Sequence, residues 1–111
     1  MRKLLVGLVV GTACAGAQAE FKDGNKLLSE LNSEVYYSKG VAIGYIMGVA
    51  DAVSGVTHCA PPNVTAGQIN DMVKNMLENT PSIRHWTADV IINYVLKSTW
   101  PCPKGRGGQS L

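Results

Sequence analysis

The sequence predicts an all-α fold, a compact bundle of four helices with one disulfide, which follows an N-terminal signal peptide. Apolar residues recur three and four positions apart in four stretches, as they do on one face of a helix. No stretch shows the convincing alternation of a β-strand. We therefore expect a signal peptide over residues 1–19, one helical domain over 20–103 and a flexible tail over 104–111.

The N-terminus has the three parts of an export signal. Arg2 and Lys3 precede an apolar run over 4–10, and small residues then lead to an A-x-A pattern that ends at Ala19. We expect cleavage after Ala19 and a periplasmic location. The apolar run is too short to remain as a membrane anchor, so no stable membrane insertion is expected.

Cleavage changes both the charge and the cysteine count of the chain. Loss of Arg2 and Lys3 lowers the basic residues from 10 to 8, which equals the 8 acidic residues, so the mature domain is formally neutral. The charge therefore gives no reason to expect a nucleic-acid partner. Cys14 leaves with the signal peptide, unless it ends a lipobox, which the glycine at position 11 argues against. Cys59 and Cys102 remain and predict one structural disulfide, worth roughly 4 kcal/mol in the chain-entropy model.

The first two expected helices run from about Asn25 to Val35 and from Lys39 to Ser54. The second is apolar around most of its circumference, and a strip of small residues follows one side at a spacing of four: Gly40, Gly44, Gly48 and Ala52. Interior glycines cost about 1 kcal/mol each relative to alanine. We therefore interpret this helix as the central one, with a neighbouring element packed closely against Gly44 and Gly48.

Asp51 lies along the same strip. We interpret it as a structural carboxylate that accepts a hydrogen bond from a facing backbone or pairs with Arg84 or His85. A catalytic role is the less favoured alternative, because a lone acid lacks the second acid of general acid/base catalysis.

The third expected helix follows the proline pair at 61–62, with Thr65 as N-cap and Gln68 as its capping-box partner. The fourth begins at Thr80-Pro81 and runs to about Thr99, where Pro101 stops it. Cys102 follows at once. The disulfide is therefore expected to join the end of the fourth helix to the loop before the third.

No catalytic or metal site emerges from the pattern. The two mature cysteines are the candidate nucleophiles, and both are expected in the disulfide. His58 and His85 do not stand at zinc-ligand spacing with each other or with the cysteines, so we interpret them as surface histidines. We therefore expect no enzyme and no cofactor. Trp86 and Trp100 are interpreted as packing residues, with an exposed interface anchor as the alternative.

Four motifs occur in order along the mature chain. They are Asp23-Gly24-Asn25-Lys26-Leu27-Leu28, then Gly44-Tyr45-Ile46-Met47-Gly48-Val49-Ala50-Asp51-Ala52, then Cys59-Ala60-Pro61 with Val64-Thr65-Ala66-Gly67-Gln68, and finally Pro81 with Arg84-His85, Ala88 and Trp100-Pro101-Cys102. Together they resemble the Rap/Tai immunity proteins of type VI secretion. The resemblance implies an all-α periplasmic protein, often a homodimer, that binds a secreted peptidoglycan amidase effector and blocks its active site. It implies neither catalysis nor a cofactor.

The sequence departs from this family pattern at one place. Many relatives carry a second cysteine pair on the first two helices, where Leu31 and Ala42 stand here. Two apolar residues can pack where a bridge was, so we expect the fold to survive with a less firmly held first helix. The identity of the toxin partner stays open.

The resemblance leads to a first hypothesis, an immunity protein that sequesters a cell-wall amidase. The expected contact surface is the outer side of the third helix with the turn after it: Gln68, Asp71, Lys74, Asn75, Asn79 and Ser82. The alternatives are a small periplasmic acid-stress chaperone and a structural partner in an envelope assembly. The chaperone ranks lower because only eight acidic groups and two histidines are available as triggers.

Overall fold

The computed structural model describes residues 21–104, which form an all-α bundle with no strand among them. Its elements are α1 (Gly24–Leu31), α2 (Tyr36–Val53), α3 (Ala66–Asn79), the short 3-10 helix η2 (Pro81–Ile83) and α4 (Ala88–Thr99). The predicted fold class is therefore confirmed. The expected signal peptide over 1–19 and all but the first residue of the expected tail lie outside the described residues.

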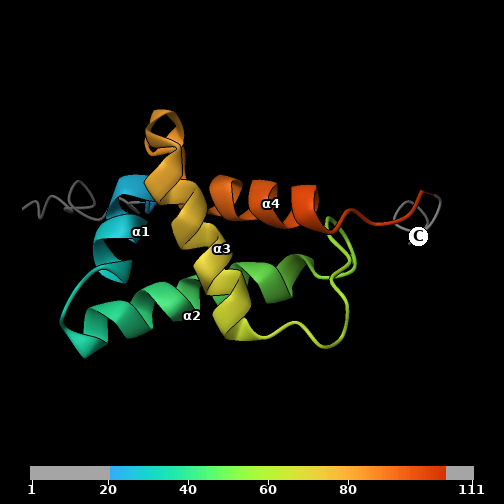
Figure 1. Ribbon diagram of the computed structural model, residues 1–111, viewed down its shortest axis with the longest axis horizontal. Coiled ribbons are helices and arrows are strands. Elements are labelled where there is room, and N and C mark those ends of the chain that lie inside the picture. The colour runs from blue at the N-terminus through green and yellow to red at the C-terminus, as the bar shows by residue number, and fades with distance from the viewer. Residues whose placement is uncertain (1–20, 105–111) are drawn as a thin grey trace, which may run out of the picture.

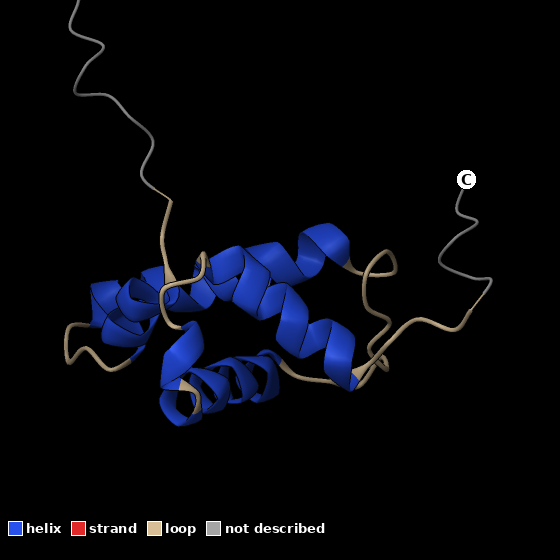
Figure 2. Ribbon diagram, turned by 90° about the horizontal axis from the view of Figure 1, so that it is seen from above, coloured by secondary structure: helices blue, strands red, loops and turns tan. Residues whose placement is uncertain are grey.

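The helices are arranged so that each contacts the other three. α2 and α4 run in the same direction along the molecule, and α3 crosses them diagonally (Figure 1). α1 lies at the end where α2 and α4 begin, and a view from above shows the helices gathered into one body (Figure 2). Because α2 and α4 run the same way, their C-terminal ends meet at one end of the bundle.

The core lies between the four helices and draws on all of them. The largest fully buried side chains are Leu27, Ile46, Val73, Leu77, Ile91, Ile92 and Leu96. Burying a side chain of this size stabilises a fold by about 1.5–3 kcal/mol. Leu31 and Ala42 also belong to this core. The expected apolar packing at these two positions is confirmed.

The first helix is shorter than expected. It begins after Asp23, whose carboxylate accepts a hydrogen bond from the backbone N–H of Lys26 at 2.9 Å. It ends at Leu31 rather than Val35, and Val35 is instead the exposed N-cap residue of α2. The expected end of the first helix at Val35 is therefore wrong: the chain turns after Leu31, where no glycine or proline in the sequence marks the turn.

The fourth helix is also shorter than expected, because the segment from Pro81 forms a 3-10 turn and α4 begins only at Ala88. The carbonyls of Arg84 and Trp86 accept hydrogen bonds from the first N–H groups of α1, on Asn25 and Gly24, both at 2.9 Å. A helix start leaves such N–H groups without intrahelical partners. The break before α4 therefore supplies a cap for α1. In a continuous helix from Thr80, these two carbonyls would accept hydrogen bonds within that helix instead.

The same junction explains Gly24. A Cβ atom at this position would lie 2.6 Å from Cδ1 of Ile91 and 2.8 Å from the carbonyl oxygen of Arg84. Both distances are far below van der Waals contact, so only glycine lets α1 lie this close to α4 and the preceding turn.

The strip of small residues on α2 is not packed as expected. Gly40, Gly44 and Gly48 are exposed, and a Cβ atom at any of them would have no neighbouring atom within 4 Å. α2 instead faces the core with its opposite side: Ala42, Ile46 and Ala50. The predicted close approach to Gly44 and Gly48 is therefore wrong within this chain, because the glycine side of the helix faces away from the core.

The expected role of Asp51 is also wrong. Its side chain is exposed, and among residues 21–104 neither Arg84 nor His85 forms an ion pair with it. Arg84 instead donates from Nε to the carbonyl of Leu77 at 2.6 Å and from Nη2 to the carbonyl of Glu78 at 3.0 Å. The guanidinium therefore caps the C-terminal turn of α3, where the helix macrodipole favours a cation.

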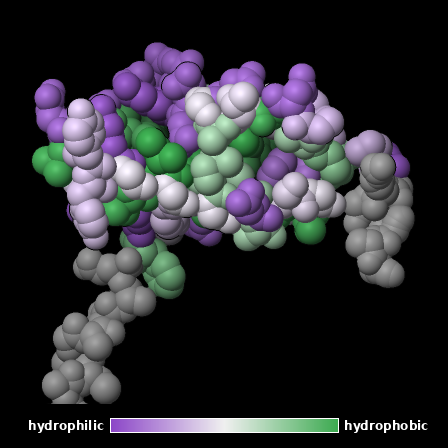
Figure 3. All heavy atoms as spheres, turned by 90° about the horizontal axis from the view of Figure 1, so that it is seen from below, coloured by the Kyte–Doolittle hydropathy of each residue, from purple (hydrophilic) through white to green (hydrophobic). Residues whose placement is uncertain are grey.

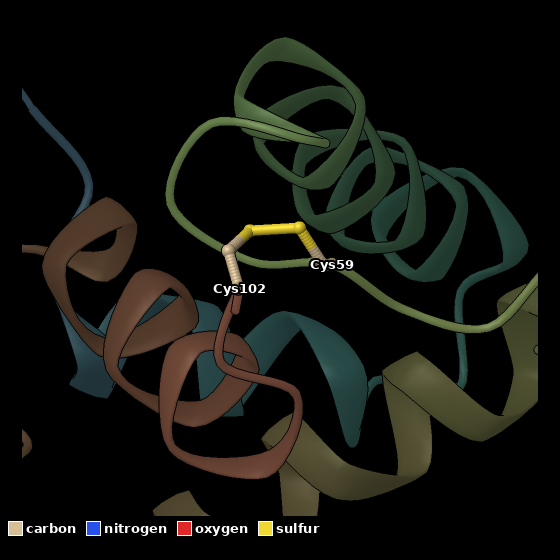
Figure 4. The surroundings of a disulfide bond; sticks show 2 residues. All are labelled: Cys59 and Cys102. Carbon is tan, nitrogen blue, oxygen red and sulfur yellow. A yellow bond between two sulfur atoms is a disulfide. The ribbon is translucent and has the colours of Figure 1, made fainter. Parts of the chain in front are cut away.

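The disulfide joins Cys59 to Cys102, as predicted (Figure 4). It links the loop after α2 to the segment that follows α4, at the end where the two helices finish. The backbone N–H of Cys59 also donates to the carbonyl of Trp100 at 2.8 Å. The loop is therefore held to the end of α4 by a covalent bond and a hydrogen bond.

Candidate interaction surface

Within the described part of the chain, the side chains form neither a cluster of metal ligands nor a free thiol. No three His, Cys, Asp or Glu residues of 21–104 come together as a metal site would require. Cys59 and Cys102 are bonded to each other, so neither offers a thiolate. Of the helices in these residues, none is long and apolar enough to cross a membrane. The surfaces of the helices are therefore the features to consider.

The outer side of α3 gathers the residues expected to contact a partner. Asp71 and Asn75 are four residues apart and exposed, and the exposed Asn79 follows after another four. This spacing places the three on one helix face. Gln68 is exposed one turn before Asp71, and Ser82 is exposed on the turn that follows the helix. The α3 residues therefore form one polar surface, and Ser82 lies on the turn that follows it.

Lys74 lies beside this surface rather than at its centre. It is partly buried, and its ammonium group lies 3.9 Å from the Glu78 carboxylate one turn later. An exposed pair of this kind contributes only about 0.3–0.5 kcal/mol. Lys74 therefore remains available to a partner at little cost.

Both ends of the α3 surface are fixed by local hydrogen bonds. The Thr65 hydroxyl accepts from the backbone N–H of Gln68 at 3.1 Å, and the Gln68 side chain accepts from the backbone N–H of Thr65 at 2.8 Å. This is the predicted capping box. At the other end, the Asn79 amide donates to the carbonyl of Asn75 at 2.9 Å. The surface is therefore ordered before any partner binds, which lowers the entropic cost of association.

A set of exposed apolar residues around the start of α4 was not singled out from the sequence. Val90 and Tyr94 lie one turn apart on α4 and are 48% and 50% exposed, and Trp86, in the segment before the helix, is 38% exposed. Trp100, in contrast, packs against the core, as expected. Trp86 thus follows the alternative interpretation, a tryptophan left partly exposed. The four-residue spacing of Val90 and Tyr94 could have indicated the exposed side of this helix, but the core-facing residues of the same helix masked the signal.

Tyr45 lies half-buried next to this side of the molecule. Burial raises the pKa of its phenol, and the nearby carboxylate of Asp89 raises it further. The Lys22 ammonium lies 5.2 Å from the centre of the Tyr45 ring and forms an ion pair with Glu30. Tyr45 therefore stays protonated at neutral pH. The contact between Lys22 and the Tyr45 ring also holds the start of the described chain against α2.

His58 is the one buried polar side chain of the described residues, with 2% of its surface exposed. Its Nδ1 atom has no hydrogen-bond partner in residues 21–104. Burial lowers the pKa of the imidazole below its usual value. The expected role of a surface histidine is wrong here, because the turn after α2 folds the ring inward beside the disulfide. His85 is exposed, as expected.

Comparison with known proteins assigns the family. A family model described as Rap1a immunity proteins matches residues 13–102. The chain belongs to the Rap1a immunity protein family. The matched residues include all four α-helices, the α3 surface and both cysteines of the disulfide. No curated protein matches the chain. Membership in the Rap1a family gives the protein an immunity function, which means binding a cognate effector.

Proposed function

We propose that this Rap1a family member is a periplasmic immunity protein that binds a peptidoglycan amidase delivered by type VI secretion and blocks the active site of that enzyme. The family match over residues 13–102 carries the proposal. In keeping with the resemblance found in the sequence, the protein is further proposed to act as a homodimer. Cleavage after Ala19 would release the mature chain into the periplasm.

The proposed contact surface is the outer side of α3 with the turn after it. Its members are Gln68, Asp71, Lys74, Asn75, Asn79 and Ser82. Inhibition of this kind is steric, so it requires a surface that holds its shape and not a reactive group. A stable interface of standard size buries about 800 Å² on each partner. The polar side chains of α3 would form its hydrogen bonds, while the capped helix holds them in place.

The experiment is an inhibition assay with the mature protein and amidases from type VI secretion loci. We expect one amidase to lose peptidoglycan hydrolysis at micromolar inhibitor and to bind the protein in calorimetry. Asp71→Arg and Asn75→Arg should weaken binding at least tenfold, because each places a long cation in the interface. Ser98→Arg is the matched control, since Ser98 is exposed on α4, outside the proposed surface.

The outcomes separate the proposal from its rivals. If no amidase is bound or inhibited at micromolar concentration, the amidase role is lost. Suppression of the light scattering of a client protein at acid pH would then favour the chaperone alternative. If an amidase is inhibited equally by all three variants, the enzyme is the partner but the α3 surface is not the contact.

A further inference from the structure

The outer face of α2 is an exposed apolar surface with no partner in the described chain. We define the α2 outer face by the residues that point away from the core: Tyr36, Tyr37, Gly40, Val41, Ile43, Gly44, Gly48, Asp51 and Ala52. Figure 3 shows the molecule from below, which is the side on which α2 lies in Figure 1. The middle of this side is largely green or near-white, the colours of apolar and intermediate residues, and the purple of hydrophilic residues occurs there in isolated places. Few charged groups therefore interrupt this side.

An exposed face of this composition is unusual for a helix. α2 is apolar around most of its circumference, but only Ala42, Ile46 and Ala50 are buried. A helix that is apolar all round is normally covered on all sides. Tyr36 and Tyr37 are 90% and 79% exposed, although both are large aromatic residues. Apolar surface of this kind marks a site of association.

The order of residues on the α2 outer face is symmetric about Gly44. Gly40 and Gly48 lie one turn to either side, and Tyr37 and Asp51 lie two turns to either side. A two-fold axis through Gly44 would place an antiparallel copy of the helix opposite the first. The residues along the centre line of the face then lie opposite each other: Gly44 with Gly44, Gly40 with Gly48, and Tyr37 with Asp51.

We infer that the α2 outer face is where two copies of this chain pair, antiparallel about Gly44. Small residues meet small residues at the centre, and larger apolar residues meet on either side. At both ends, the Tyr37 hydroxyl of one copy can donate to the Asp51 carboxylate of the other. Between Gly40 and Ala50 the chain has no charged residue, so like charges do not oppose each other across the centre.

This pairing also accounts for the glycines of α2. Each interior glycine costs about 1 kcal/mol relative to alanine, and within one copy nothing packs against them in return. In the pair, the missing side chains let the two helix backbones approach closely. A parallel pair would instead place Asp51 against Asp51, and the two helix dipoles would repel each other. The antiparallel arrangement avoids both.

The inference rests on the homodimer of the proposed function and not on its amidase. It can therefore be tested with the mature protein alone, by analytical ultracentrifugation from micromolar to millimolar concentration. We expect a dimer for the unchanged sequence and a monomer for Gly44→Arg. Circular dichroism should remain that of the folded protein, because a Cβ atom at position 44 has no atom of its own copy within 4 Å. Ser98→Arg, with the same side chain elsewhere, should stay dimeric.

Two further variants test the register. Tyr37→Phe should weaken the dimer by about tenfold or more, because two equivalent hydrogen bonds to a carboxylate are lost. Gly44→Cys should form a disulfide-linked dimer on oxidation, because residue 44 faces itself across the axis, whereas Ser98→Cys should not. A monomer at every concentration, or a dimer that survives Gly44→Arg, would overturn the inference. A dimer that Gly44→Cys fails to cross-link would overturn the two-fold register.

Discussion

Single residues of this chain differ widely in how strictly the fold constrains them, and two helical glycines mark the extremes. Gly24 lies where α1 meets α4, with backbone and side-chain atoms within 3 Å of any added Cβ. Gly44 lies in the middle of α2, with nothing within 4 Å. Both glycines belong to motifs that resemble the family pattern, but only the first is required by the packing of one chain.

Gly24→Ala is expected to destabilise the protein by about 1–3 kcal/mol, because the carbonyl of Arg84 is backbone and cannot move aside cheaply. Gly44→Ala is the matched control. It should stabilise the folded chain by up to about 1 kcal/mol, because alanine favours a helix and meets no obstacle. Urea unfolding at low protein concentration measures both. Equal effects of the two substitutions would contradict the close packing at Gly24.

His58 is expected to make stability fall as the pH falls. The lowered pKa means that the folded protein resists protonation of this imidazole, whereas the unfolded chain takes up a proton near pH 6.5. Below pH 6.5 the unfolded chain therefore binds more protons than the folded protein, and this difference lowers the free energy of unfolding. Above pH 6.5 the imidazole is neutral in both states and His58 causes no such loss of stability. His58→Gln should have a shallower decline in melting temperature between pH 7 and pH 5. The exposed His85→Gln variant, run in parallel, should retain the full slope.

At the scale of elements, the helices with local signals were predicted well. α3 has a capping box at its start and a regular apolar face, and its expected start at Thr65 agrees with the structure. α2 was expected from Lys39 to Ser54 and is found from Tyr36 to Val53. These boundaries are set by caps, prolines and apolar spacing, which are properties of neighbouring residues in the chain.

The errors at this scale share one cause. The Thr80-Pro81 pair is a typical helix start, but the carbonyls of Arg84 and Trp86 are needed by the N-terminus of α1, some 60 residues earlier in the chain. The glycine strip of α2 was expected to face a neighbouring element of the same chain, but it faces outward. Both outcomes depend on contacts between distant segments, which the spacing of residues within one segment does not encode.

At the scale of the whole molecule, the disulfide lies at the end of the bundle where α2 and α4 finish, and it joins the segments that follow these two helices (Figure 4). It closes a loop of 43 positions that contains α3 and with it the proposed effector surface. The position of α3 relative to α2 and α4 therefore depends on both the shared core and this covalent link.

Replacing Cys59 and Cys102 together by serine is expected to cost about 2–5 kcal/mol of stability, because the unfolded chain regains the entropy of an open loop. This is a large part of the 5–15 kcal/mol that stabilises a typical domain. Thermal unfolding of the double variant and of the reduced wild-type protein should show the same loss of stability relative to the oxidised wild-type protein. A free thiol at either position in the folded mature protein would contradict the predicted bridge.

The sequence by itself determined the four helices, the cysteine pair and the family resemblance, because caps, apolar periodicity and motif order are all local or linear properties. The proposed contact residues on α3 could be named in advance for the same reason, since the spacing of Gln68, Asp71, Asn75 and Asn79 already places these four on one face. The tertiary structure alone decided that Gly24 is buried against α4, that His58 is enclosed and that the glycines of α2 face outward. Each of these depends on which segments meet in space, and that is fixed only when the hydrophobic core closes around all four helices.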